Sequence, residues 1–147
     1  TFRKLSEHAL DRIQTFFPEM KPAWTRTGIL PGGDMPNADF DQFLGDFKAR
    51  CPWLPGALLK HYARLYGTRA QKLIGDARSL NDLGMCFGSS FYEREADFLI
   101  AEEWAEAAED ILERRTKHGL HLSEAERQRF GQWMENHRKA VNLEAQG

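Results

Sequence analysis

The sequence predicts an all-α protein, and three observations lead to this prediction. Apolar residues recur every three to four positions in several segments, which is the spacing of one helix face. Prolines and glycines fall between these segments, and no segment sustains the alternation of apolar and polar residues typical of a strand. We therefore expect mainly α structure: a small irregular domain of about five to seven helices with a long Pro/Gly-rich connection. At most one short strand is expected, in the 92–100 region.

Size and composition indicate one globular body. The chain has 147 residues, of which 41% are apolar and 29% charged, a composition that favours an ordered core over a disordered tail. The net charge of −2 argues against a dedicated nucleic-acid binder, since phosphate contacts need a clear basic excess. No apolar run approaches the roughly 18–20 residues of a membrane span. Cys51 and Cys86 fit a reducing compartment, and the start at Thr1 predicts a piece of a longer protein.

The first predicted helix covers residues 3–17. It places on one face Leu5, Ala9, Ile13 and Phe16 or Phe17. Pro18 ends it, because the residue before a proline is disfavoured in the α region. Residues 18–36 hold four of the six prolines and three of the twelve glycines, so they predict a long irregular connection. A connection of this length in a compact domain is usually functional or packed against another part of the protein.

Three more helices are predicted in the middle of the chain. The first covers about 38–50, with Asn37 or Asp39 as its N-cap. The next follows two prolines and ends at Gly67, the usual residue after a helix C-terminus. Its apolar face consists of Leu58, Leu59, Tyr62 and Leu65 or Tyr66. Thr68 is expected to cap a short fourth helix.

The second half predicts two longer helices after a region of turns. Residues 75–91 contain scattered glycines and predict turns around one or two short helices. Residues 92–116 predict a helix with a kink near Trp104. Ser123 and Glu126 form a capping box that opens the last helix. Its expected buried stripe is Phe130, Trp133, Met134, His137 and Val141.

Two sequence patterns resemble a catalytic motif and a metal-binding motif, but each is better explained by a structural role. Gly84 to Gly88 match G-x-C-x-G around Cys86, but a nucleophile elbow needs a preceding strand and an α/β sheet, so a small buried cysteine is expected. His118 and His121 are three residues apart, but Gly119 interrupts the helix that would align them. We expect no metal site, because a histidine near a helix C-terminus usually interacts with the helix dipole.

The segment 93–113 is strongly acidic, with nine acids and one base. Convergent carboxylates could do acid–base work, but a solvated helical stripe is favoured, formed by Glu102, Glu106 and Glu109 or Glu113. Arg114 and Arg115 follow, and either complement the helix dipole or form a docking face for a neighbouring domain or an anionic lipid surface.

The last helix could lie on a membrane surface through its mixture of apolar and basic residues, but we expect it to close the core. No glycine loop of the Rossmann or P-loop type is present. The residues alone thus predict an α-helical module with no catalytic residue, no metal and no cofactor of its own. A free-standing helical module that binds another protein remains an alternative.

An ordered set of unusual strings resembles a known family. The strings are Thr1-Phe2-Arg3-Lys4-Leu5 with Glu7-His8-Ala9, Ala23-Trp24-Thr25, Leu30-Pro31-Gly32-Gly33, His61-Tyr62-Ala63-Arg64 with Tyr66-Gly67, Glu103-Trp104, and Asp110-Ile111-Leu112-Glu113-Arg114-Arg115-Thr116. Together they resemble the C-terminal domain of the aerobic, FAD-dependent glycerol-3-phosphate dehydrogenases and glycerophosphate oxidases. The resemblance runs from Thr1 to about residue 136.

The resemblance implies a division of labour in a longer enzyme. The parent would oxidise sn-glycerol 3-phosphate to dihydroxyacetone phosphate with FAD, and a membrane quinone or oxygen would reoxidise the flavin. Residues 1–17 would be the closing helix of the FAD domain, and residues 18–147 a helical C-terminal cap. Thr1 would lie near the cofactor only in the intact enzyme, and Arg114 and Arg115 would contact another domain or a phosphate.

The resemblance also implies a location and partners for the parent. A quinone-using parent would be cytoplasmic and peripheral at the cytoplasmic face of the inner membrane. Its partner within the polypeptide would be the N-terminal FAD and substrate domain, and a homodimer is compatible with the family.

Overall fold

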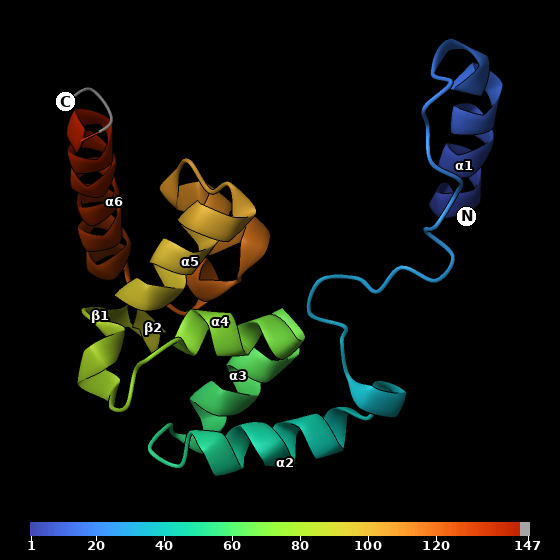
Figure 1. The fold of residues 1–147 in the computed structure, drawn as a ribbon. Helices are drawn as coiled ribbons and strands as arrows, with labels where there is room; N and C mark the ends of the chain where they lie inside the picture. The colour runs from blue at the N-terminus through green and yellow to red at the C-terminus, as the bar shows by residue number, and fades with distance from the viewer. Residues whose placement is uncertain (145–147) are drawn as a thin grey trace.

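The computed structural model describes the backbone of residues 1–144 and the side chains of residues 1–137. In this part of the chain, six α-helices and one small hairpin follow one another (Figure 1). The helices are α1 (Phe2–Ile13), α2 (Phe40–Arg50), α3 (Gly56–Tyr66), α4 (Ala70–Ile74), α5 (Glu93–Glu103) and α6 (Glu124–Glu144). A π-helix, η5 (Asp110–Arg115), and short 3₁₀ turns join them, and the hairpin consists of β1 (Cys86–Gly88) and β2 (Phe91–Tyr92). The predicted mainly α class is confirmed.

The N-terminal helix α1 stands away from the body formed by α2 to α6 (Figure 1). It buries none of its residues, so the predicted apolar stripe is present but faces solvent. A 3₁₀ turn over Gln14–Phe16 ends the helical segment before Pro18. The predicted irregular connection follows, and no described helix is long and apolar enough to cross a bilayer.

The long connection is fixed to the body by two glycines that touch. The backbone N of Thr68 donates to the carbonyl oxygen of Gly32 at 3.0 Å. A Cβ on Gly32 would lie 2.5 Å from the carbonyl oxygen of Tyr66, and one on Gly67 would collide with the carbonyl of Gly32. Both glycines also have positive φ, of 85° and 56°. This close approach gives a physical reason why the strings Leu30-Pro31-Gly32-Gly33 and Tyr66-Gly67 occur together in the set that resembles the family.

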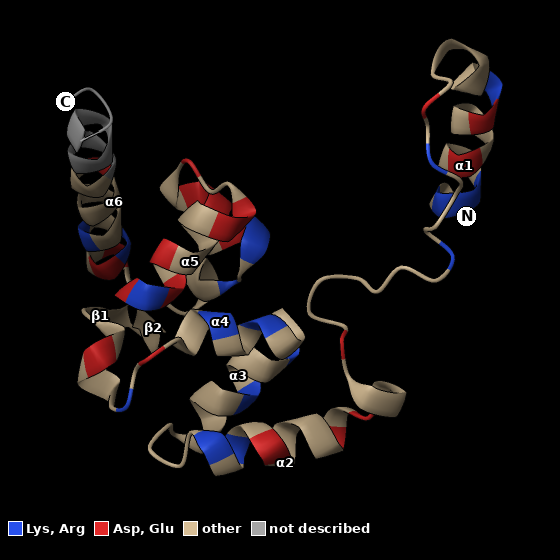
Figure 2. Cartoon of the chain, viewed as in Figure 1, with Lys and Arg blue, Asp and Glu red and all other residues tan. Residues whose placement is uncertain are grey.

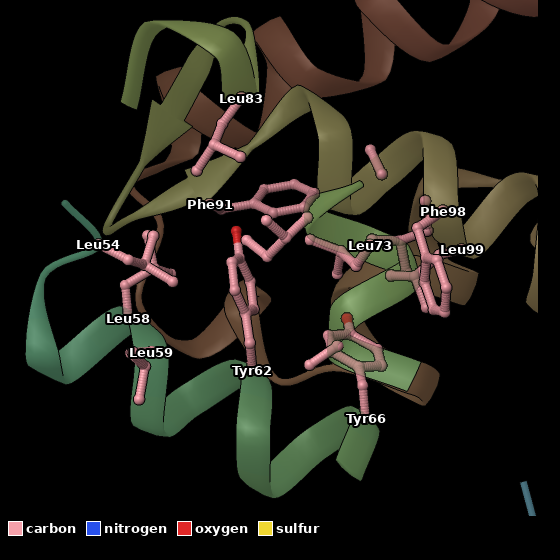
Figure 3. Close-up of a cluster of buried hydrophobic side chains, with 14 of the residues drawn as sticks. Leu54, Leu58, Leu59, Tyr62, Tyr66, Leu73, Leu83, Phe91, Phe98 and Leu99 are labelled. Atoms are coloured by element: carbon pink, nitrogen blue, oxygen red, sulfur yellow. The ribbon is translucent and has the colours of Figure 1, made fainter. Parts of the chain in front are cut away.

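The core of the body lies between helices α2 to α6 and the hairpin. Its largest fully buried side chains include Tyr62, Phe47, Phe87, Phe91, Phe130, Leu73, Leu83, Leu99 and Ile111. Figure 3 shows Tyr62 and Tyr66 pointing from α3 toward Phe91, Leu73 and Leu99. The predicted apolar face of α3 and the Phe130 and Met134 positions of α6 are confirmed as buried. Val141, expected in the same stripe, lies outside the residues with described side chains.

Two predicted helix starts are confirmed by their capping hydrogen bonds. The backbone N of Gln42 donates to Asp39 Oδ1 at 2.9 Å, which makes Asp39 the N-cap of α2. The backbone N of Ser123 donates to Glu126 Oε2 at 2.7 Å, as a capping box requires. The predicted cap at Thr68 is wrong: this residue lies in a 3₁₀ turn, and α4 begins only at Ala70.

The hairpin corrects two predictions. A strand was expected within 92–100, but β2 ends at Tyr92 and α5 follows directly. The turn uses Ser89 and Ser90 with φ of 45° and 62°, a two-residue turn with both φ positive that usually contains Asn or Gly. Cys86, expected to be buried, is exposed on β1, while Cys51 is the buried cysteine. Burial raises the pKa of the Cys51 thiol.

The helix predicted over 92–116 is interrupted instead of kinked. Trp104 ends α5 in the left-handed conformation, with φ 54° and ψ 41°. The acidic stripe expected along one helix face is therefore wrong, because Glu102 and Glu106 lie on opposite sides of this break. Glu102 instead pairs with Lys72 at 2.7 Å and Arg69 at 3.3 Å. Figure 2 shows acidic positions on α5 and basic positions on α4, and these two helices contact each other.

Candidate functional site

A fully buried carboxylate, Glu95, lies in the first turns of α5 and collects three hydrogen bonds. Its Oε1 accepts from the Tyr66 hydroxyl at 2.7 Å and contacts His61 Nε2 at 3.1 Å. Its Oε2 contacts His118 Nε2 at 3.0 Å. Helix α3 supplies Tyr66 and His61, while the 3₁₀ turn after η5 supplies His118. Two separate elements thus converge on a carboxylate carried by a third.

The electrostatics of this cluster favour an ionised Glu95. Burial raises the pKa of the carboxyl, but hydrogen bonds from His118 and His61 outweigh burial, and the pKa lies below its ordinary value. Burial and the neighbouring Glu95 raise the pKa of Tyr66, so its phenol stays protonated and donates. The cluster therefore places a buried negative charge between two imidazoles and a phenol.

A cavity of about 300 Å³ adjoins the cluster. His61 and His118 line it, together with Ala57, Leu58, Ser89, Ser90, Lys117 and His121. His118 is almost fully buried and stacks on Phe91, with ring centroids 4.5 Å apart. His61 is one-third exposed. The cluster is thus accessible from one side and closed by the core on the other.

Little in the sequence points to this arrangement. Glu95 lies 34 residues from His61 and 23 from His118, so no local spacing connects them. The expectation for His118 was a helix dipole contact, whereas its imidazole contacts Glu95. One signal was available: Glu95 lies four positions before Leu99 on the face of α5 that also buries Ala96.

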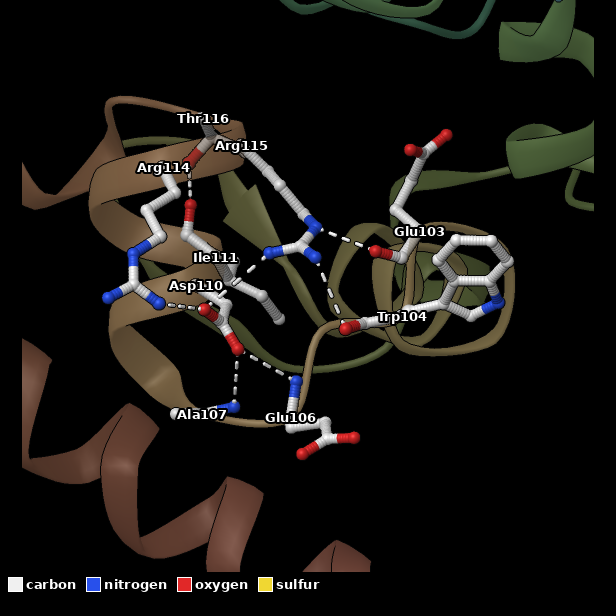
Figure 4. A network of polar contacts seen from close by, with 9 residues as sticks. All are labelled: Glu103, Trp104, Glu106, Ala107, Asp110, Ile111, Arg114, Arg115 and Thr116. Atoms are coloured by element: carbon white, nitrogen blue, oxygen red, sulfur yellow. Dashed lines mark hydrogen bonds and ion pairs between the residues drawn. The ribbon is translucent and has the colours of Figure 1, made fainter.

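The two arginines singled out by sequence, Arg114 and Arg115, both contact Asp110 (Figure 4). Arg115 donates from Nε to the carbonyl of Glu103 at 2.7 Å and from Nη2 to that of Trp104 at 3.2 Å. Arg115 is three-quarters buried, so it ties η5 to the end of α5. Arg114 is 72% exposed and donates to Asp110 Oδ1 at 2.5 Å.

Asp110 is the centre of this second network. Its Oδ2 accepts from the backbone N of Glu106 and of Ala107, both at 3.0 Å. These hydrogen bonds, with that from Arg114, lower the pKa of Asp110 to about 2. Because Arg115 donates to the carbonyls of Glu103 and Trp104, the network gives a reason why the strings Glu103-Trp104 and Arg114-Arg115-Thr116 occur together. The side chain of Trp104 takes no part in the network and is 84% exposed at the break after α5.

The remaining predicted site residue, Thr1, precedes α1. Its carbonyl accepts from the backbone N of Leu5 at 3.1 Å, and its side chain makes no capping hydrogen bond to the helix. A role for Thr1 near a cofactor, and contacts of Arg114 and Arg115 with another domain, stay predictions.

The comparisons with known proteins place this architecture in a family. Residues 23–141 match the family described as the C-terminal domain of alpha-glycerophosphate oxidase, and the chain belongs to that family. It is thus a C-terminal domain of the kind found in glycerol-phosphate oxidoreductases, as the sequence resemblance indicated.

Three relatives of the chain carry the names of two different dehydrogenases. The chain is 47% identical over 136 residues to the D-erythritol 1-phosphate dehydrogenase of Brucella abortus. It is 41% identical over 134 residues to the aerobic glycerol-3-phosphate dehydrogenase of Escherichia coli, and 41% identical over 145 residues to the glycerol-3-phosphate dehydrogenase of Pseudomonas aeruginosa. These matches cover 92%, 91% and 97% of the chain but 27%, 26% and 28% of the relatives. The chain thus spans about a quarter of the length of these relatives.

Proposed function

We propose that the chain is the C-terminal cap of an FAD-dependent dehydrogenase that oxidises sn-glycerol 3-phosphate to dihydroxyacetone phosphate and passes the electrons to a quinone. The observation that carries this proposal is the family match over residues 23–141, together with 41% identity to two glycerol-3-phosphate dehydrogenases. The 47% identity to a D-erythritol 1-phosphate dehydrogenase favours a second substrate of the same chemical kind. Both candidates are phosphorylated polyols.

We propose that this chain does not itself hold the FAD. The sequence has no G-x-G-x-x-G loop to hold a pyrophosphate. We therefore assign the flavin, which would accept the hydride, to the rest of a longer polypeptide. The role of the chain is then to pack against that part and help fix the flavin and substrate domains relative to each other.

The exposed apolar face of the N-terminal segment supports this packing role. Phe2 is 91% exposed, Leu5 68% and Phe16 78%, all on α1 or the 3₁₀ turn that follows it. Apolar side chains gathered in this way usually mark a contact surface. We propose that they pack on the FAD domain. A free-standing module would instead use them to bind a separate protein.

The contact predicted for the arginines belongs to the same proposal. Arg114 presents an exposed guanidinium, whereas Arg115 is committed to the carbonyls of residues 103 and 104. In the parent, Arg114→Ala therefore tests an inter-domain or phosphate contact without breaking the loop. Lower flavin retention or activity is expected, and unchanged values would remove Arg114 from the interface.

The proposed electron acceptor implies a location for the parent. We propose that it is cytoplasmic and associates peripherally with the inner membrane, where it meets its quinone. The support is the likeness to an aerobic glycerol-3-phosphate dehydrogenase. Fractionation of cells that make the parent checks this proposal.

A substrate assay tests the proposed activity. The longer protein encoded together with this chain is purified and assayed with an artificial electron acceptor. Parallel reactions contain sn-glycerol 3-phosphate, D-erythritol 1-phosphate or unphosphorylated glycerol as control. We expect turnover of a phosphorylated polyol, with the higher kcat/KM identifying the substrate. No turnover of either phosphate by flavin-loaded protein would refute the proposal.

A further inference from the structure

The cluster around Glu95 has the composition of a metal site. It offers two imidazole nitrogens and one carboxylate, from His61, His118 and Glu95, and these ligand atoms all lie within 4.8 Å of one another. Imidazole and carboxylate together are ligands that Zn²⁺ takes in proteins. The separations of 3.1 and 3.0 Å between carboxylate oxygens and Nε2 atoms are close to the roughly 3.3 Å between neighbouring ligands in a tetrahedron with bonds of about 2.0–2.1 Å.

The charge of the cluster favours a cation. Glu95 is fully buried, and its hydrogen-bond partners among the described residues are a phenol and two imidazoles. A buried carboxylate is costly unless an opposite charge is close. A divalent ion held between the carboxylate and neutral imidazoles would supply that charge. An anion in the same place would face the carboxylate directly.

The surroundings supply what a metal site needs beyond its ligands. The Tyr66 hydroxyl donates to Glu95 at 2.7 Å and would orient the carboxylate, as partners of metal ligands do. Stacking on Phe91 fixes the ring of His118. The adjoining cavity, which His61 and His118 line, would leave a coordination position for water or a small ligand.

We propose that His61, Glu95 and His118 bind a divalent transition-metal ion of the Zn²⁺ class. The two histidines bind through Nε2, and Glu95 binds through its carboxylate. The ion joins α3, α5 and the turn at His118, which hold these ligands. The test of this site measures metal binding to the chain itself, so its outcome does not depend on the proposed dehydrogenase activity.

The experiment titrates the metal-free 147-residue chain. The chain is treated with a chelator, dialysed, and titrated with Zn²⁺ by calorimetry and with Co²⁺ by visible absorption. The continuous core over residues 43–134 gives this chain a folded body of its own. We expect one Zn²⁺ per chain with a Kd in the micromolar range or tighter, and Co²⁺ bands typical of four or five ligands.

Three variants and one matched control assign the site. His61→Ala and Glu95→Gln should each weaken Zn²⁺ binding by at least about tenfold, and Tyr66→Phe by about 10- to 100-fold. His8→Ala is the control, because His8 is an exposed histidine on α1. It should bind as the unchanged chain does. Circular dichroism confirms that each variant is folded, and His61→Ala, at a one-third exposed position, keeps the test valid if Glu95→Gln does not fold.

Three results would overturn the proposal. The first is no binding of Zn²⁺ or Co²⁺ at micromolar concentrations. The second is binding that folded His61→Ala retains undiminished, which would place the ion elsewhere. The third is Zn²⁺ binding that folded Glu95→Gln and Tyr66→Phe both retain undiminished, which would show that the carboxylate is not a ligand.

Discussion

Replacing Arg115 with alanine measures how strongly the network at the end of α5 stabilises the domain. The guanidinium donates to the carbonyls of Glu103 and Trp104 at 2.7 and 3.2 Å and is three-quarters buried. Hydrogen bonds from a charged group contribute about 1.5–3 kcal/mol each, less where solvent reaches them. We expect Arg115→Ala to lower the free energy of unfolding by ~2 kcal/mol. For a chain of this length that corresponds to a fall in Tm of ~6 °C.

The neighbouring arginine is the matched control. Arg114 is 72% exposed and forms one surface ion pair, so Arg114→Ala should cost less than ~1 kcal/mol. Urea denaturation of the 147-residue chain, followed by tryptophan fluorescence, measures both variants. Equal losses for the two variants, or no loss for Arg115→Ala, would show that the two carbonyl contacts do not hold this loop.

Three further predictions test other parts of the structure. Gly67→Ala should destabilise the chain by ~1–3 kcal/mol and expose the connection to proteolysis, because its Cβ would collide with the carbonyl of Gly32; unchanged cleavage kinetics would refute the contact. The pKa of Asp110 is lowered from 3.8 to about 2, so its carboxylate stabilises the fold fully above the pKa of 3.8, and this contribution is lost as the pH falls toward 2. Asp110→Asn should therefore flatten the dependence of the unfolding free energy on pH in this acidic range. A variant whose stability falls with pH as steeply as that of the unchanged chain would contradict this. Phe87→Ala should cost ~3–5 kcal/mol in chemical denaturation, since the ring is fully buried between Phe91 and Phe130; a loss below ~1 kcal/mol would place it outside the core.

The helices could be predicted where local signals agree. Asp39 caps α2, Gly67 ends α3 with positive φ, and Ser123 with Glu126 opens α6. In each case one residue type satisfies the backbone at a helix end, whatever packs around it. These signals are local, and the sequence therefore contains them in full.

The breaks and the hairpin depend on contacts between distant residues. Trp104 takes a left-handed conformation at a place where Arg115 holds the preceding backbone. Ser89 and Ser90 form a turn that glycine or asparagine would ordinarily mark. No spacing rule anticipates either feature, because tertiary contacts outweigh local preference at these positions.

The candidate site was beyond sequence reasoning for the same reason. His61, Glu95 and His118 come from α3, α5 and a 3₁₀ turn, and only the packing of these elements brings them together. The sequence predicts a solvated acidic segment, because no local spacing shows that Tyr66 and His118 pack against one of its carboxylates. Its one fully buried member, Glu95, is the residue on which the site is built.

Reassembly of the enzyme from two parts tests the central claim most directly. The parent lacking the residues of this chain is purified, and its flavin absorbance and oxidation of phosphorylated polyol are measured with and without the added 147-residue chain. We predict that the shortened parent retains little flavin and activity, that the chain alone has neither, and that mixing restores both. A shortened parent with full flavin content and turnover, or oxidation of the phosphorylated polyol by the chain alone, would contradict the assignment of this chain as a cap.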